Sequence, residues 1–74
     1  MTLMRDDETH QFEWYLVRET EKARCFSESI NGSNSFWVPR SLISGFAKYP
    51  AAPGELPLCL LEVPEWFAEK EDLL

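Results

Sequence analysis

Apolar and polar residues alternate from position 12 onward, and this pattern predicts a sheet in the first half of the chain. Residues 12–17 place Phe, Trp and Leu at every second position, and aromatic and β-branched side chains favour strands. The polar residues 18–22 then predict a turn. A second strand is expected over 23–30 and a third over 35–38. They are joined by the Asn-Gly-Ser-Asn turn at 31–34, because Asn and Gly tolerate positive φ.

The second half of the chain predicts one more strand. Pro39 removes a ladder donor and ends the third strand. Residues 41–46 are expected to form a helical turn capped by Ser41, and the proline-rich residues 47–57 to form a surface loop. The nearly continuous apolar run over 58–63 predicts a fourth, well-buried strand.

A short helix is predicted from Pro64, which suits the first helical position. On a helical wheel an apolar face (Trp66, Phe67, Leu73 and Leu74) separates from an acidic face (Glu65, Glu69 and Asp72). A helix this short needs to dock on the sheet to be stable. The chain is therefore expected to be α+β, with a leader over residues 1–11 that frays and a single domain over 12–74. In that domain a small antiparallel sheet of about four strands, bent or barrel-like, is closed by the C-terminal helix.

Charge narrows the classes of partner. The 74 residues carry 13 acidic and 7 basic side chains, a formal charge of −6. This balance argues against nonspecific binding of nucleic acid and against docking on an anionic membrane, because both need a basic surface. A partner with a basic face is the electrostatic match, and simple solubility is the alternative explanation.

The acids concentrate towards the C-terminus, where residues 55–74 hold six of them against one lysine. A rigid helix with such charges can occupy a basic groove that otherwise holds DNA or RNA, although a solvated helix face is the simpler explanation. The predicted partner-binding residues are five acids and two aromatic anchors: Glu62, Glu65, Glu69, Glu71, Asp72, Trp37 and Tyr15.

The aromatic residues leave two readings open. Trp14 and Tyr15 are adjacent in one strand, and Phe36 and Trp37 in another, so each pair points to opposite sheet faces. Either the sheet curls into a barrel whose core holds aromatic side chains, or one aromatic face of the sheet contacts a partner. Stacking on single-stranded nucleic acid is a third use of such residues, and the negative charge weighs against it.

Residues for catalysis or metal binding are scarce. His10 is the single histidine, and no cysteine stands at metal-ligand spacing from it, so we expect no metal, no cofactor and no enzymatic activity. Cys25 and Cys59 lie in apolar strands, where cysteine behaves as a small hydrophobe, and the sequence leaves open whether they are close together. Without a secretion signal or a membrane span, reduced thiols in a cytoplasmic protein are expected.

Three motifs resemble a small domain of phage and mobile-element genes. They are Glu21-Lys22-Ala23, Phe36-Trp37-Val38-Pro39-Arg40-Ser41 and Val63-Pro64-Glu65-Trp66-Phe67-Ala68-Glu69-Lys70. The domain's pattern is a lysine-alanine strand start, a tryptophan-leucine-proline-lysine-serine centre and a proline-glutamate-tryptophan-leucine-alanine tail. Val38 and Arg40 replace the usual leucine and lysine, and the proline-rich loop departs further. The resemblance covers residues 20–74 and implies a phage accessory protein without catalytic residues.

In size and charge alone the chain also resembles the anti-CRISPR class, many of whose members block the DNA-binding surface of an effector complex. We therefore expect a non-enzymatic inhibitor that binds a basic, nucleic-acid-handling complex of a bacterial host, above all a CRISPR effector. It would contact neither nucleic acid nor membrane. The alternative is a phage accessory module for recombination or replication that forms a homodimer through its aromatic sheet face. The third possibility is a structural role in which the charge serves solubility only.

Overall fold

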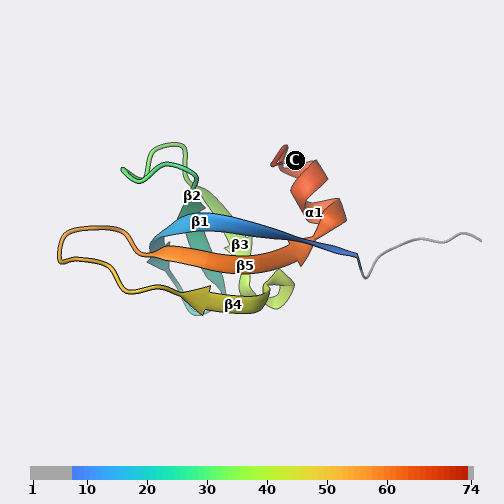
Figure 1. Ribbon diagram of the computed structural model, residues 1–74. Coiled ribbons are helices and arrows are strands. Elements are labelled where there is room, and N and C mark those ends of the chain that lie inside the picture. The colour runs from blue at the N-terminus through green and yellow to red at the C-terminus, as the bar shows by residue number, and fades with distance from the viewer. Residues whose placement is uncertain (1–7, 74) are drawn as a thin grey trace, which may run out of the picture.

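Five antiparallel strands and one short C-terminal helix make up the fold in the computed structural model, which describes residues 8–73 (Figure 1). In chain order the elements are β1 (Thr9–Glu19), β2 (Ala23–Ser27), β3 (Phe36–Pro39), the 3-10 turn η1 (Arg40–Leu42), β4 (Ser44–Lys48), β5 (Leu58–Pro64) and α1 (Glu65–Lys70). The predicted antiparallel sheet with a C-terminal helix is confirmed. The prediction of about four strands was one short.

The first and last strands lie side by side in the middle of the sheet, whose order is β3-β2-β1-β5-β4. β5 pairs with β1 from Thr9 to Tyr15, with Trp14 opposite Cys59, and β2 pairs with the other end of β1. An irregularity between Leu16 and Arg18 bends β1 at the point where β2 joins it.

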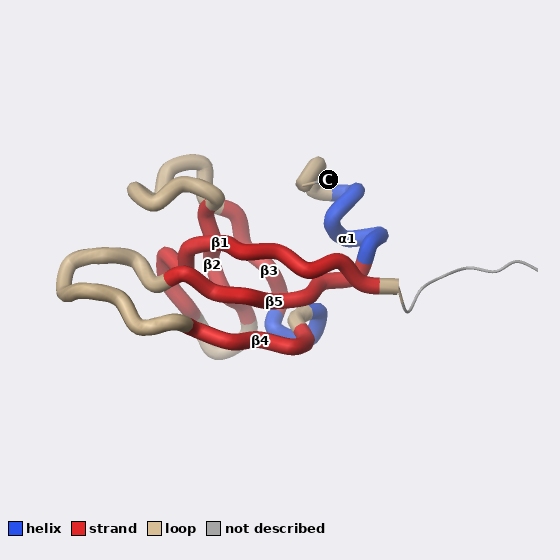
Figure 2. Tube along the Cα trace, in the orientation of Figure 1, coloured by secondary structure: helices blue, strands red, loops and turns tan. Residues whose placement is uncertain are grey.

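The sheet is strongly curled, as Figure 2 shows. Its two edge strands, β3 and β4, are separated in the chain only by residues 40–43, which can span at most about 18 Å even when extended. The edges of a flat five-stranded sheet would lie about 19 Å apart, and η1 shortens the connection further. In agreement, Arg24 of β2 lies 4.0 Å from the ring centre of Phe46 in β4, although β1 and β5 lie between these strands in the sheet. β3 and β4 are not paired over residues 8–73, so the sheet is bent without closing.

The hydrophobic core fills the concave face of the curl and ends under α1. Its buried members are Trp14, Leu16, Phe26, Val38, Cys59, Leu61 and Val63 from the sheet, and Phe67 and Ala68 from the helix. The Trp14 ring stacks on Phe12 with 4.4 Å between ring centroids and meets Phe36 edge-on at 4.8 Å, both favourable aromatic geometries. The predicted docking of the helix on the sheet is confirmed.

Strand β4 corrects the prediction for residues 41–57. Only Arg40–Leu42 is helical, and its N-cap is Pro39 with no side-chain capping bond, so Ser41 does not cap it. The next residues, Ser44–Lys48, form an edge strand with a register shift and with Gly45 at φ 58°. The sequence hides this strand because an edge strand has one neighbour, and here only Phe46 is partly buried.

The strand predicted over 23–30 ends early, at Ser27. The Ser27 hydroxyl donates to the carbonyl oxygen of Ser33 at 2.6 Å and accepts from the Ser29 N–H at 3.0 Å, so local bonds replace the ladder. Gly32 and Asn34 have positive φ, as the turn signal predicted, within a longer loop over residues 28–35.

The ends of the domain differ from the prediction in two ways. Residues 9–11, which were assigned to a fraying leader, are paired in β1, and residues 1–7 lie outside the described part of the chain. The predicted apolar helix face is wrong for Trp66, which is 47% exposed, because the helix docks through Phe67 and Ala68. Leu73 is half-buried against the core, and Leu74 lies outside the described residues. Over residues 8–73, no helix is long and apolar enough to cross a bilayer.

Candidate functional site

Four of the predicted acids gather at α1. Glu65 and Glu69 lie in the helix, Glu71 and Asp72 follow it directly, and we call these four residues the helix acids. Three of them are exposed and Glu65 is half-buried, 3.7 Å from the His10 Nε2 through its Oε2. His10 was predicted to lie in the leader, but it is part of β1 and sits beside the start of the helix. The helix acids therefore present a negative surface at one end of the molecule.

The other three predicted residues lie away from the helix acids. Glu62 alternates along β5 with the core residues Leu61 and Val63, which places its side chain on the convex face of the sheet. Tyr15 and Trp37 likewise alternate with core residues of β1 and β3, so they also point to the convex face. Trp37 is 46% exposed at the sheet edge. Neither predicted aromatic anchor lies on the helix.

Trp66 is the aromatic residue that accompanies the helix acids. It follows Glu65 directly, and Glu69 lies three positions on, where helical side chains are neighbours. Its indole meets the ring of Phe67 edge-on at 6.0 Å, which holds it against the docked part of the helix. Sequence analysis missed this role because it placed Trp66 and Phe67, which are about 100° apart on the helical wheel, on one apolar face. Of these two residues, the docked helix buries only Phe67.

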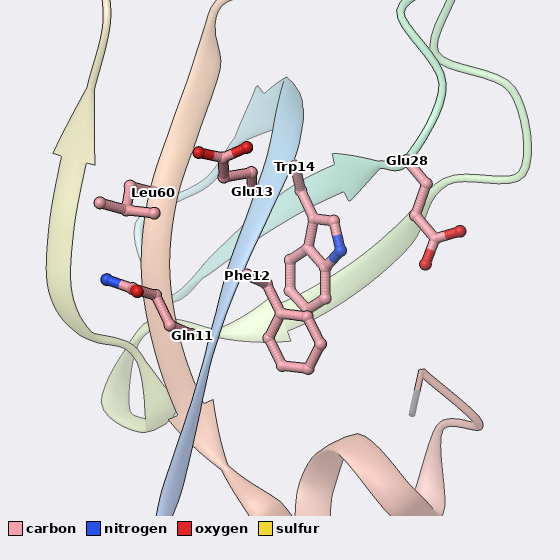
Figure 3. A pocket seen from close by; sticks show the side chains of 6 residues that line it. All are labelled: Gln11, Phe12, Glu13, Trp14, Glu28 and Leu60. Carbon is pink, nitrogen blue, oxygen red and sulfur yellow. The ribbon is translucent and has the colours of Figure 1, made fainter.

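An open hollow runs along β1 on the side where β2 has ended (Figure 3). It has a volume of about 560 Å³, and its lining includes two acids and two aromatic rings: Gln11, Phe12, Glu13, Trp14, Glu28 and Leu60. A second hollow of about 420 Å³ shares Glu28 and extends to Glu71 and Asp72. We call the two together the edge groove. Among residues 8–73, its lining contains acids and no lysine or arginine.

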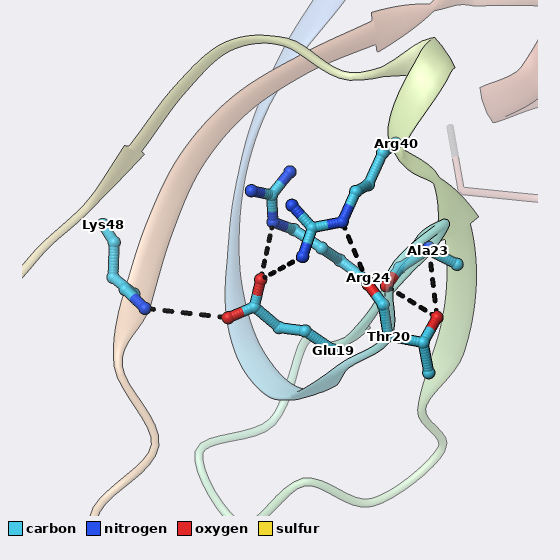
Figure 4. A network of polar contacts seen from close by, with 6 residues as sticks. All are labelled: Glu19, Thr20, Ala23, Arg24, Arg40 and Lys48. Carbon is cyan, nitrogen blue, oxygen red and sulfur yellow. Dashed lines mark hydrogen bonds and ion pairs between the residues drawn. The ribbon is translucent and has the colours of Figure 1, made fainter.

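Three basic residues gather at the opposite end of β1, around Glu19 (Figure 4). Its carboxylate lies 3.1 Å from Arg24 Nε, 2.9 Å from Arg40 Nη2 and 3.8 Å from Lys48 Nζ. Arg40 also donates from Nε to the Thr20 carbonyl oxygen at 3.0 Å. These pairs tie β1 to β2, η1 and β4, so they hold the curl of the sheet together, and the Glu19 carboxylate offsets one of the three positive charges.

We expect Glu19→Gln to lower the free energy of unfolding by about 1 kcal/mol, because three cations lose one partly exposed carboxylate. Urea unfolding at low and high salt measures this, and the loss should shrink as salt screens the ion pairs. Glu21→Gln, at an exposed position in the following turn, is the control and should have little effect. Equal stability of the two variants at low salt would show that the cluster is structurally neutral.

The two cysteines are free thiols inside the protein. Cys25 pairs with Trp37 and Arg18 across neighbouring strands, while Cys59 lies in β5 opposite Trp14, so they occupy different parts of the sheet. Burial raises the pKa of the Cys59 thiol, and the nearby Lys48 and Arg24 oppose that rise. Within residues 8–73, no three His, Cys, Asp or Glu side chains are arranged to hold a metal ion.

Comparisons with protein-family models, with curated proteins and with solved structures find no significant match to this chain.

Proposed function

We propose that the protein is a non-enzymatic inhibitor that places its acidic helix surface on a basic face of a host nucleic-acid-handling complex. The observation that carries this proposal is Trp66, 47% exposed and flanked by Glu65 and Glu69 on a docked helix. Tryptophan is enriched at the energetic centres of protein interfaces, and surrounding acids favour a basic partner. A purely solubilising surface does not need an exposed tryptophan.

The separation of charge along β1 also supports binding through the helix end of the molecule. Glu19, which pairs with three cations, and Thr9, which lies opposite Pro64 directly before α1, are at opposite ends of an eleven-residue strand. At about 3.3 Å per residue the strand is roughly 33 Å long, which is several Debye lengths at physiological salt. The helix end therefore keeps its negative potential, and it is the end that a basic groove attracts.

Within this proposal, the partner is a CRISPR effector in the bacterial cytoplasm, and the helix acids compete there with DNA phosphates. The size and charge of the chain support this choice, as does the resemblance of its motifs to phage domains. The first experiment is to express the protein in cells that carry one effector type at a time and to challenge them with a targeted phage. Loss of protection with one type supports the proposal and identifies the complex, and intact protection with all types contradicts this choice of partner.

The helix surface is tested with the triple variant Glu65→Lys, Glu69→Lys, Asp72→Asn. Asp72 has φ 62°, which asparagine tolerates well, so the change removes charge without adding strain. We expect binding to the identified complex to weaken roughly 10- to 100-fold at low salt and less at high salt. Trp66→Ala should weaken it by a similar factor through lost contact area, with little dependence on salt.

Exposed acids away from the helix supply the control, Glu21→Lys with Glu55→Lys, which alters the net charge without touching α1. Binding measured by titration calorimetry should be nearly unchanged for this pair. If the triple variant bound as tightly as the wild type, the acidic helix would not be the contact surface.

One observation favours a second candidate, the homodimeric accessory module. Trp37 is 46% exposed on the edge strand β3, and edge strands with exposed aromatic residues often pair with another chain. Light scattering distinguishes the candidates, because a dimer that Trp37→Ala converts to a monomer supports the module. A wild-type monomer at all concentrations argues against it.

A further inference from the structure

The central strand β1 is paired on one side along most of its length and only partly on the other. β5 pairs with it from Thr9 to Tyr15, whereas β2 pairs only from Tyr15 to Glu19 and then turns away at residue 28. From Thr9 to Trp14, the edge of β1 opposite β5 therefore has no neighbouring strand among residues 8–73.

The register shows which backbone groups face this open edge. The Leu16 N–H donates to the Pro57 carbonyl oxygen at 2.9 Å, which continues the β1–β5 ladder, so the polar backbone groups of Leu16 point towards β5. Successive residues of a strand direct these groups to opposite sides. Gln11 and Glu13 consequently direct their N–H and C=O groups to the open edge, and no backbone bond within residues 8–73 satisfies them.

The edge groove lies beside these backbone groups. Glu28 stands across it from β1, and Figure 3 shows the nitrogen of the Trp14 indole on the side that faces Glu28. Trp14 is 2% exposed, and none of the side-chain hydrogen bonds within residues 8–73 uses its N–H. Within residues 8–73, no buried side-chain nitrogen or oxygen lacks a hydrogen-bond partner, so the indole nitrogen is reached by solvent in the groove and is free to donate to water or to a ligand. The groove thus offers the unpaired backbone groups of two strand residues, Gln11 and Glu13, together with one indole donor and an acidic rim.

We propose that the open edge of β1 accepts an extended basic segment of the partner protein as an additional strand. The segment pairs with the backbone of Gln11 and Glu13, a carbonyl oxygen of it accepts from Trp14 Nε1, and its lysine or arginine side chains lie beside the acids of the groove. Addition of a strand to an open sheet edge is a general mode of peptide recognition. This inference rests on the proposed function for the basic character of the partner.

A second copy of this chain fits the edge poorly. Each copy carries a charge of −6, and pairing two β1 edges would bring together two acidic grooves, each lined by Glu13 and Glu28. Like charges opposite one another in a sheet are destabilising. The acids of the groove therefore select a basic strand over self-association.

The test uses the intact protein and a peptide of alternating arginine and valine, blocked at both ends and roughly eight residues long, the length of a typical strand. The key variant is Gln11→Pro, which removes one N–H at the open edge without changing charge or the β1–β5 ladder. Gln11→Ala is the matched control, since it shortens the same side chain and keeps the N–H. We expect Gln11→Pro to bind about three- to tenfold more weakly than Gln11→Ala.

Hydrogen exchange on the wild type gives a second measurement that does not depend on the folding of a variant. The peptide should slow exchange at the amides of Gln11 and Glu13 and shift the indole N–H resonance of Trp14. The contrary result is that the peptide binds without these changes and binds Gln11→Pro and Gln11→Ala with equal affinity. That result would show that the peptide is held by electrostatic attraction alone and would overturn strand addition. Failure of the peptide to bind at low salt would also overturn it.

These outcomes distinguish failure of strand addition at β1 from failure of partner binding by the helix surface. The proposed function is tested by the variants of Trp66 and the helix acids, measured on the complex itself. If only the peptide experiment fails, strand addition is contradicted and the proposed function is not. A concentration-dependent dimer that Gln11→Pro disrupts would assign the edge to a second copy of the chain and contradict the basic partner.

Discussion

Phe26→Ala is expected to leave the protein largely unfolded at room temperature. Phe26 is fully buried between β1 and β3, opposite Leu16 and Phe36, and its ring lies 5.7 Å from that of Trp14. Truncation of a buried phenylalanine to alanine typically costs about 3–5 kcal/mol. A single core in a domain of this size rarely supplies more than about 3–5 kcal/mol in total, so the loss is comparable to the whole stability.

Circular dichroism during urea titration measures this change. The control is Ile30→Ala, which also removes an apolar side chain but at a loop position that is 60% exposed, and it should shift stability by less than about 0.5 kcal/mol. A cooperative transition for Phe26→Ala within 1 kcal/mol or so of the wild type would show that the concave core relaxes around the cavity.

Phe67→Ala is expected to detach α1 while the sheet stays folded. The helix has six residues, too few to persist alone, and its buried contacts come from Phe67 and Ala68. Loss of the ring should weaken docking by about 3 kcal/mol. The strands keep their own ladders and core, so the change is local, and the helix acids and Trp66 lose their fixed arrangement.

Hydrogen exchange reports this detachment at two amides, because Glu71 N–H donates to the Phe67 carbonyl and Leu73 N–H to the Ala68 carbonyl. Both should exchange much faster in Phe67→Ala, while the amides of Phe12 and Trp14 remain protected. Binding of the partner should fall at least as far as in the triple charge variant. Lys70→Ala, exposed on the same helix, is the control for a change that leaves docking intact. Simultaneous loss of protection in the sheet would show that helix and strands unfold as one unit.

The strongly patterned segments were the predictable part of the fold. Alternation over residues 12–17 and the apolar run of β5 both reflect burial on the concave face, and burial is what such patterns report. The start of the helix was predicted to within one residue. Pro64, expected at the first helical position, is the N-cap and the last residue of β5, and the helix begins at Glu65.

Features set by tertiary contacts escaped prediction. Strand β4 exists because β5 offers it a free edge, and its sequence, Ser-Gly-Phe-Ala-Lys, carries almost no strand signal. The exposure of Trp66 follows from which side of a short helix meets the sheet, and two adjacent aromatic residues do not specify that side. The open edge beside Gln11 depends on the early end of β2 at Ser27, where two side-chain bonds decide the outcome.

Of the predicted site, the helix acids gather as expected, while Tyr15, Trp37 and Glu62 lie on the convex face. The difference has a simple origin. Sequence order brings Glu65, Glu69, Glu71 and Asp72 together on one short segment, but it cannot show which strand face an aromatic side chain joins until the core is known.

The pairing of β1 with β5 also governs when the protein becomes functional during synthesis. Of the five strands, the two central ones are synthesised first and last, so the nascent chain cannot complete its sheet before Pro64 emerges. Until then, β1 lacks the strand that pairs with it from Thr9 to Tyr15, and the core residues Trp14 and Leu16 are open to chaperones and proteases. Long-range pairing of this kind also slows folding towards milliseconds or seconds. Helix surface and groove therefore arise together, in one late step after translation of the last strand.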